Sequence, residues 1–151
     1  MQMSRHARAI IGRRGVLAGT AGLNALLEHC RVLVCMLPLT EDTRGLLDRA
    51  TLSRLPRDAY VVNVSRGALL VEEDLLALVD SGALSGAMLD VLREEPLPAS
   101  HAFWHHPRIA ITPHISAETR IEESVVQIAA KIRRLEAGLP VSGVVDRARS
   151  Y

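Results

Sequence analysis

The fold is decided by one stretch of sequence, Ala59-Tyr60-Val61-Val62-Asn63-Val64, which is followed by Ser65-Arg66-Gly67. This stretch is continuously apolar rather than alternating, which is typical of a strand covered on both faces in a parallel sheet. Three similar apolar runs occur elsewhere in the chain, and we predict that each is a strand of the same sheet: Val32–Met36, Gly86–Val91 and Arg108–Thr112.

Helix-like segments separate these apolar runs. They are Thr20–His29, Asp48–Leu55 and Glu72–Ser81, of which the last opens with three acids suited to a helix N-terminus and precedes Gly82. Strands that alternate with helices form βαβ units, which cross over right-handed into a parallel sheet. The sequence therefore predicts an α/β fold.

A longer helix is predicted over Ala117–Ala137, with Ser116 as its N-cap and Gly138 as its stop. Apolar residues recur along it at helical spacing and form one stripe. The members of this stripe are Ile121, Val125, Ile128, Ile132 and Leu135.

Composition narrows the class of protein. The 151 residues are 48% hydrophobic, enough for one domain with a core, and 18 Lys and Arg balance 17 Asp and Glu. The net charge of +1 provides no field to attract nucleic acid or an anionic membrane. Cys30 and Cys35 form no CxxC motif, and no signal-peptide or membrane-spanning run is present, so we expect reduced thiols in a cytoplasmic protein.

Polar residues follow each apolar run, where ligands bind in open α/β sheets. Arg66 follows the second run, Asp90 ends the third with Glu94 and Glu95 just beyond it, and His114 follows the fourth. A carboxylate stabilises the charged form of a neighbouring histidine, and an arginine can grip a carboxylate through two parallel hydrogen bonds. Together these groups suit reduction of a 2-oxo acid with hydride from a cofactor.

Each of these residues also has an ordinary structural interpretation. Taken singly, Arg66 is more often a solvated loop residue, Glu95 a surface charge and His114 a structural residue; their joint placement favours function. A further group near Trp104 (His101, His105 and His106) is interpreted as loop residues rather than a zinc site.

Four motifs resemble those of the D-isomer-specific 2-hydroxyacid dehydrogenases, in family order over residues 20–137. Asn63-Val64-Ser65-Arg66-Gly67 before the Glu-Glu-Asp-Leu-Leu helix resembles their arginine signature. The other three are Gly86–Val91 followed by Glu95-Pro96, Thr112-Pro113-His114-Ile115, and Leu37-Pro38-Leu39-Thr40 with Thr43. Met3-Ser4-Arg5 resembles the end of the second strand in NADP-preferring members, and residues 97–108 and 145–151 resemble the glyoxylate/hydroxypyruvate reductase branch.

The resemblance implies a role for each matching residue. Arg66 would clamp the substrate, His114 would donate the proton, and Glu95 would orient His114. Asp90 would hold the nicotinamide carboxamide, and Arg5 the 2′-phosphate of NADP. The full set of implied cofactor-binding residues, for NADP or NAD, is Ser4, Arg5, Leu37, Pro38, Thr43, Val64, Ser65 and Asp90.

The resemblance also implies a domain organisation. Residues 1–116 would be part of a Rossmann-type, doubly wound parallel sheet, residues 117–137 an inter-domain helix, and residues 138–151 a tail that joins a substrate domain. The partners implied are a small 2-oxo acid such as glyoxylate or hydroxypyruvate and, in a full-length form, a second copy in a homodimer. No metal is implied.

One family feature is absent from the sequence, which contains no GxGxxG motif for a pyrophosphate. We therefore interpret the chain as a truncated oxidoreductase that binds cofactor poorly and does not catalyse by itself. The alternative is a non-catalytic nucleotide-binding module or an inactive fragment.

Overall fold

The structure is a computed structural model that describes residues 8–11, 15–145 and 147. Four strands form the main sheet in the order β3-β4-β5-β6, and all neighbouring strands are parallel. These strands are β3 (Val32–Cys35), β4 (Ala59–Asn63), β5 (Leu84–Leu89) and β6 (Ile109–Ile111). The predicted α/β fold with a parallel sheet is thereby confirmed.

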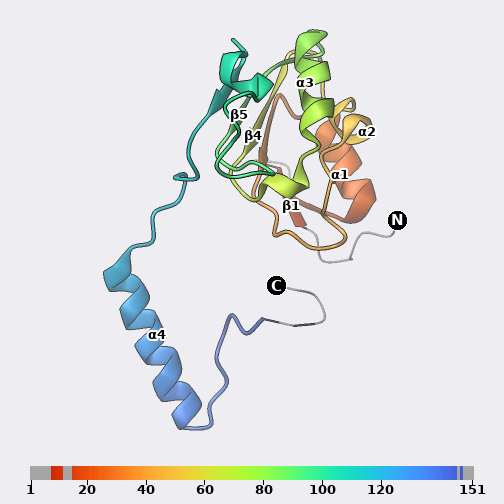
Figure 1. Cartoon of the computed structure of the whole chain (residues 1–151). Helices are drawn as coiled ribbons and strands as arrows, with labels where there is room; N and C mark the ends of the chain where they lie inside the picture. Colours follow the sequence, from red (N-terminus) through yellow and green to blue (C-terminus); the bar gives the residue numbers. More distant parts are fainter. Residues whose placement is uncertain (1–7, 12–14, 146, 148–151) are drawn as a thin grey trace. The chain divides into compact units, whose positions relative to one another are not determined.

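Three helices lie together on one side of this sheet (Figure 1). They are α1 (Gly19–Leu27), α2 (Arg49–Leu52) and α3 (Glu72–Asp80). The bounds of α1 and α3 are close to those predicted, whereas α2 is shorter than the predicted Asp48–Leu55. The Asp48 side chain caps α2 by accepting the Thr51 N–H at 2.8 Å. Three acids occupy the first turn of α3, where the helix dipole favours negative charge.

The core lies between these helices and the sheet. Alternate residues of the strands are buried there, among them Leu33, Val61 and Leu89, and they pack with Leu27 and Leu75 from the helices. Complete burial of one such leucine contributes roughly 1.5–3 kcal/mol. The core thus fixes the strands whose carboxyl ends carry the polar residues.

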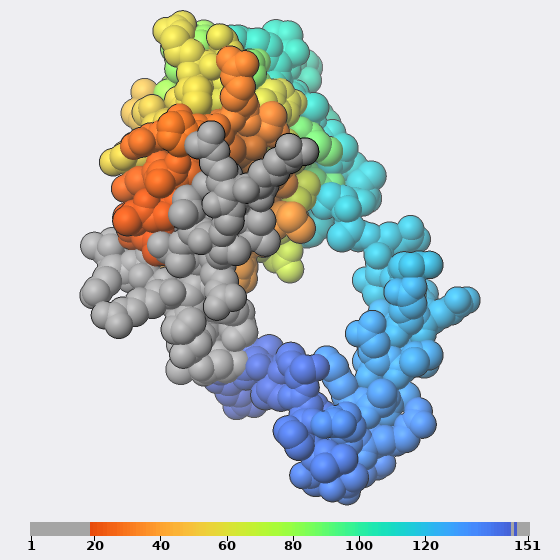
Figure 2. All heavy atoms as spheres, turned by 180° about the vertical axis from the view of Figure 1, so that it is seen from behind, coloured from red at the N-terminus to blue at the C-terminus, as the bar shows by residue number. Residues whose placement is uncertain are grey.

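The prediction that every apolar run is covered on both faces is wrong for β3. Val32 is 55% exposed and Val34 is 52% exposed, whereas Leu33 and Cys35 between them are buried. The helices cover the face that carries Leu33 and Cys35, and the opposite face lacks cover among the described residues. In the view from behind, orange spheres of the segment that contains β3 are visible at the surface (Figure 2).

A short antiparallel pair precedes the main sheet and was not predicted. It consists of β1 (Arg8–Ile11) and β2 (Gly15–Ala18), with Arg8 opposite Ala18. Ser4 and Arg5, predicted to bind the cofactor, lie outside the described residues.

The chain divides into two compact units, Met1–His114 and Ile115–Tyr151. The second unit contains α4 (Ile121–Glu136), whose predicted apolar stripe is confirmed as one helical face with every member half or more exposed. The predicted start at Ala117 with Ser116 as N-cap is wrong, because the N-cap position is Arg120 and makes no side-chain cap. Of the helices described, none combines the length and apolar character needed to cross a membrane.

Candidate active site

The predicted polar residues meet at one edge of the sheet. The register places Asn63 of β4 beside Leu89 of β5, and Leu89 beside Ile111 of β6. The segments that follow these strands therefore emerge at the same carboxyl edge, where open α/β sheets bind ligands. They carry the arginine, the acids and the histidine singled out from the sequence.

His114 and Glu95 form a direct pair within the first unit, with 2.9 Å between Nδ1 and Oε2. The second Glu95 oxygen, Oε1, accepts the Leu92 N–H at 2.9 Å. The hydrogen bond from His114, followed by that from Leu92, lowers the pKa of Glu95. Stability from this pair is therefore fully present above the pKa of Glu95 in the unfolded chain, and it is lost as pH falls through the lowered value.

The backbone at His114 adopts the left-handed region, with φ of +55°. Non-glycine residues seldom adopt it, and it costs roughly 1–2 kcal/mol. The His114 N–H donates to the Thr112 carbonyl at 3.0 Å, which tightens the turn directly after β6. This turn brings the imidazole to the loop that carries Glu95.

The side chain of Asn63 holds the Arg66 turn in place through hydrogen bonds. It is completely buried, its side-chain amide donates to the Arg66 carbonyl at 3.1 Å, and its Oδ1 accepts the Ser65 N–H and hydroxyl. The Arg66 side chain is exposed, and its Nη1 donates to the Ser65 carbonyl at 2.6 Å. Sequence reasoning gave Asn63 no role, although an amide at the end of an apolar run was a usable signal.

The Thr43 side chain stabilises the loop after β3 through hydrogen bonds to its backbone. Its buried hydroxyl donates to the Pro38 carbonyl at 2.7 Å and accepts the Thr40 N–H at 2.8 Å. These bonds hold Leu37 and Pro38 in a fixed turn at the carboxyl edge. Their contact with a cofactor, and that of half-buried Val64 and buried Ser65, stays a prediction.

Asp90 is only 1% exposed at the end of β5. The Thr112 hydroxyl donates to its Oδ1, and its own N–H donates to the Asn63 carbonyl. A buried carboxylate at this edge suits an amide donor. Because Asp90 is buried, a nicotinamide carboxamide could contact its carboxylate only if neighbouring groups moved aside.

Gly67 brings the Arg66 turn against the peptide that leads to Glu95. A Cβ placed on Gly67 would lie 2.0 Å from both the carbonyl carbon and the oxygen of Leu92. No side-chain rotation relieves such a contact, because both atoms belong to the backbone. The two loops of the site can approach this closely only because residue 67 is glycine.

We expect Gly67→Ala to destabilise the protein by roughly 3 kcal/mol, the upper part of the range for overpacking. Gly82→Ala is the control, since Gly82 has φ of +73° and open space around it. That change should cost about 1 kcal/mol through backbone conformation alone. Urea unfolding of both variants measures the difference, and equal losses would contradict the close approach.

The three histidines near Trp104 differ from their interpretation as plain loop residues. His101 and His106 flank a short 3-10 helix, Ala102–His105. His101 lies 3.6 Å from Glu72, and His106 lies 3.1 Å from Asp80, so both contact acids of α3. Within the part of the chain that the structure describes, no group of three or more His, Cys, Asp or Glu side chains is placed to hold a metal ion.

The sequence matches a family model over residues 3–116, described as the D-isomer specific 2-hydroxyacid dehydrogenase, NAD binding domain. It is 52% identical over 134 residues to glyoxylate/hydroxypyruvate reductase A of Klebsiella pneumoniae (strain 342). That alignment covers 89% of this chain and 43% of the relative. The chain thus spans less than half the length of this curated relative.

Solved structures resemble the chain closely. A D-isomer specific 2-hydroxyacid dehydrogenase from Xanthobacter autotrophicus Py2, in complex with NADPH and MES, is 40% identical with a TM-score of 0.85, covering 88% of this chain and 55% of that one. An NADPH-dependent glyoxylate/hydroxypyruvate reductase from Sinorhizobium meliloti, in complex with NADP and sulfate, is 40% identical with a TM-score of 0.82, covering 87% and 43%.

Proposed function

Because the chain belongs to the D-isomer-specific 2-hydroxyacid dehydrogenase family, we propose that it supplies the proton-donating site for reduction of a small 2-oxo acid by NADPH. The substrates are of the glyoxylate or hydroxypyruvate type, and the product is the D-2-hydroxy acid. The observation that carries this proposal is the His114–Glu95 pair at the carboxyl edge of the sheet. The test is NADPH oxidation with glyoxylate and hydroxypyruvate by a catalytically active form that contains these residues.

The geometry supports a separate task for each side chain. Glu95 contacts Nδ1 of His114, so Nε2 is the nitrogen that protonates the ketone oxygen of the substrate. The Arg66 guanidinium binds the substrate carboxylate through its planar fork. Once His114 has released its proton, Glu95 keeps the ring oriented for reprotonation. A nicotinamide cofactor would, when bound, supply the hydride.

The residues present fit the nicotinamide end of such a cofactor. The Asp90 carboxylate is an acceptor for a carboxamide, and the loop held by Thr43 presents Leu37 and Pro38 at the same edge. We propose NADP as the preferred cofactor, with NAD as the alternative. Support comes from Arg5 in the sequence and from the two relatives crystallised with NADPH or NADP.

Glu95→Gln should shift the pH dependence of reduction. His114 must carry a proton to act, so activity falls as pH rises and the proton is lost. The lowered pKa of Glu95 keeps its carboxylate charged beside the imidazole, and glutamine would remove that charge. With glutamine the fall in kcat/KM should occur at lower pH. Superimposable profiles of parent and variant would argue against the coupling.

Arg5→Ala should weaken NADPH more than NADH, because only NADPH has a 2′-phosphate to bind. We expect a loss of about tenfold or more for NADPH, corresponding to one charge-assisted contact. Cofactor titrations by fluorescence measure both dissociation constants. An equal loss for the two cofactors would exclude Arg5 from the phosphate site.

The domain organisation is proposed on similar grounds. The division of the chain after His114 supports residues 1–116 as the cofactor-binding part, and α4 (Ile121–Glu136) would be the helix between domains. Residues 138–151 would join a substrate domain. The exposed apolar stripe of α4 supports burial against such a neighbour, in a homodimeric full-length protein.

A further inference from the structure

Glu72 is a buried acid in the first turn of α3. It is 8% exposed, and its Oε1 accepts the Arg93 N–H at 2.9 Å. Its second oxygen, Oε2, lies 3.6 Å from Nε2 of His101. A carboxylate this deeply buried is retained only with such partners, because an uncompensated buried charge is strongly unfavourable.

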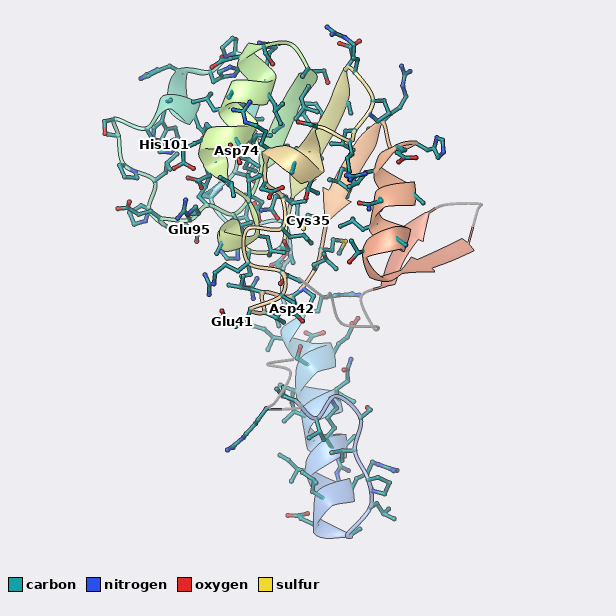
Figure 3. All side chains as sticks on the ribbon, turned by 90° about the vertical axis from the view of Figure 1, so that its right-hand side faces the viewer. Cys35, Glu41, Asp42, Asp74, Glu95 and His101 are labelled. Atoms are coloured by element: carbon teal, nitrogen blue, oxygen red, sulfur yellow. The ribbon has the colours of Figure 1, made fainter. Side chains whose placement is uncertain are left out.

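The backbone group that Glu72 binds belongs to the loop of the proposed site. Arg93 lies next to Leu92, whose N–H donates to Glu95, and Glu95 in turn contacts His114. Gly67 approaches the same Leu92–Arg93 peptide from the Arg66 turn. Figure 3 places Glu95 and His101 on the same side of the molecule, both on the segment between β5 and β6.

The neighbouring acid provides a contrast on the same helical turn. The Glu73 side chain is 76% exposed and lies 3.7 Å from the guanidinium of Arg93, not from its backbone. Exposed ion pairs of this kind contribute little and constrain no main chain. Both acids have the same charge and face the same residue, but only Glu72 can fix the path of the loop.

We propose that Glu72 is a positioning residue for the acid–base pair, holding the Leu92–Glu95 segment so that Glu95 meets His114. The role of this pair in proton donation rests on the proposed function, whereas the structural role of Glu72 does not. The Gly67 contact completes the arrangement, because it presses the Arg66 turn against the same peptide. One buried carboxylate thereby sets the position of the proton donor relative to the substrate clamp.

The first test measures the pKa of Glu95 by carboxyl carbon NMR on the whole 151-residue chain. In Glu72→Leu the loop loses its anchor, so the pKa of Glu95 should rise toward its ordinary value. Removal of a nearby negative charge alone would lower that pKa, so the sign separates positioning from electrostatics. Glu73→Leu is the matched control and should produce no rise. A pKa of Glu95 in Glu72→Leu that stays as low as in the parent would overturn the proposal.

The second test covers the case in which Glu72→Leu does not fold. Glu72→Gln keeps an oxygen that can accept the Arg93 N–H, so it should preserve the lowered pKa of Glu95. Hydrogen exchange at the Arg93 amide should be at least ~10-fold slower than in an unprotected loop, in both the parent and this variant. Unprotected exchange in the parent would refute the anchor directly.

These measurements need no turnover. A failure of the proposed reaction would leave the Glu95 pKa and the Arg93 exchange rate as valid readouts of the anchor. Conversely, an active form in which Glu72→Leu changed neither kcat nor the pH profile would refute the positioning role while leaving the reaction in place.

Discussion

Replacement of His114 by glutamine is expected to lower kcat for 2-oxo acid reduction by roughly 10²–10⁴-fold, the usual contribution of a positioned proton donor. Glutamine can still hydrogen-bond to Glu95, but it cannot release a proton to the ketone oxygen. Steady-state NADPH oxidation in a catalytically active form measures the loss. Cofactor affinity should change little, because the proposed role of the imidazole is to protonate the substrate.

His105→Gln is the matched control for this prediction. His105 is exposed at the end of the short 3-10 helix, away from the carboxyl-edge pair, and the substitution is chemically identical. We expect parental kinetics for it. A His114→Gln variant with kcat within a few-fold of the parent would remove His114 from the role of proton donor.

Replacement of Arg66 by lysine is the second change with a large expected effect. Lysine keeps the positive charge but lacks the planar fork that binds both oxygens of a carboxylate. We expect kcat/KM to fall by roughly 10²–10³-fold, as for loss of a preorganised donor at a reacting group. The hydrogen bonds of the Asn63 side chain should stay intact, because they involve the Arg66 carbonyl and Ser65 rather than the Arg66 side chain.

Arg57→Lys provides the comparison for Arg66→Lys. Arg57 is exposed and precedes β4, so it lies at the amino end of the strand that Arg66 follows. It should tolerate lysine with unchanged kinetics. Near-parental kcat/KM for Arg66→Lys would show that a point charge is sufficient, and the two-point clamp would be wrong.

The sequence by itself determined the parallel sheet, the alternation of strands and helices along the chain, and the edge that carries the candidate site residues. Continuous apolar runs separated by amphipathic segments can bury their surface only as strands and helices in layers, and parallel strands bring their carboxyl ends together. That is why the sequence alone predicts that Arg66, Glu95 and His114 lie at one edge. Apolar spacing also identified the apolar face of α4, because helical periodicity is a local property.

Residue type and spacing did not predict burial or helix ends where these depend on contacts with other parts of the chain. Val32 and Val34 resemble core residues in sequence, but whether a strand face is covered depends on what packs on it. Ser116 has the residue type of an N-cap, yet α4 begins near Arg120. The cap preference is worth only about 1 kcal/mol, so it does not by itself select where a helix starts.

The contacts that assemble the site were decided by tertiary structure alone. Gly67 touches the Leu92 peptide, Glu72 binds the Arg93 N–H, and His101 approaches Glu72. These contacts join residues about 20 or more positions apart, and no periodicity or motif encodes which donor meets which acceptor. Side-chain type determined the chemistry available at the carboxyl edge, while packing of α3 against the loop after β5 determined which groups hold Glu95 in place.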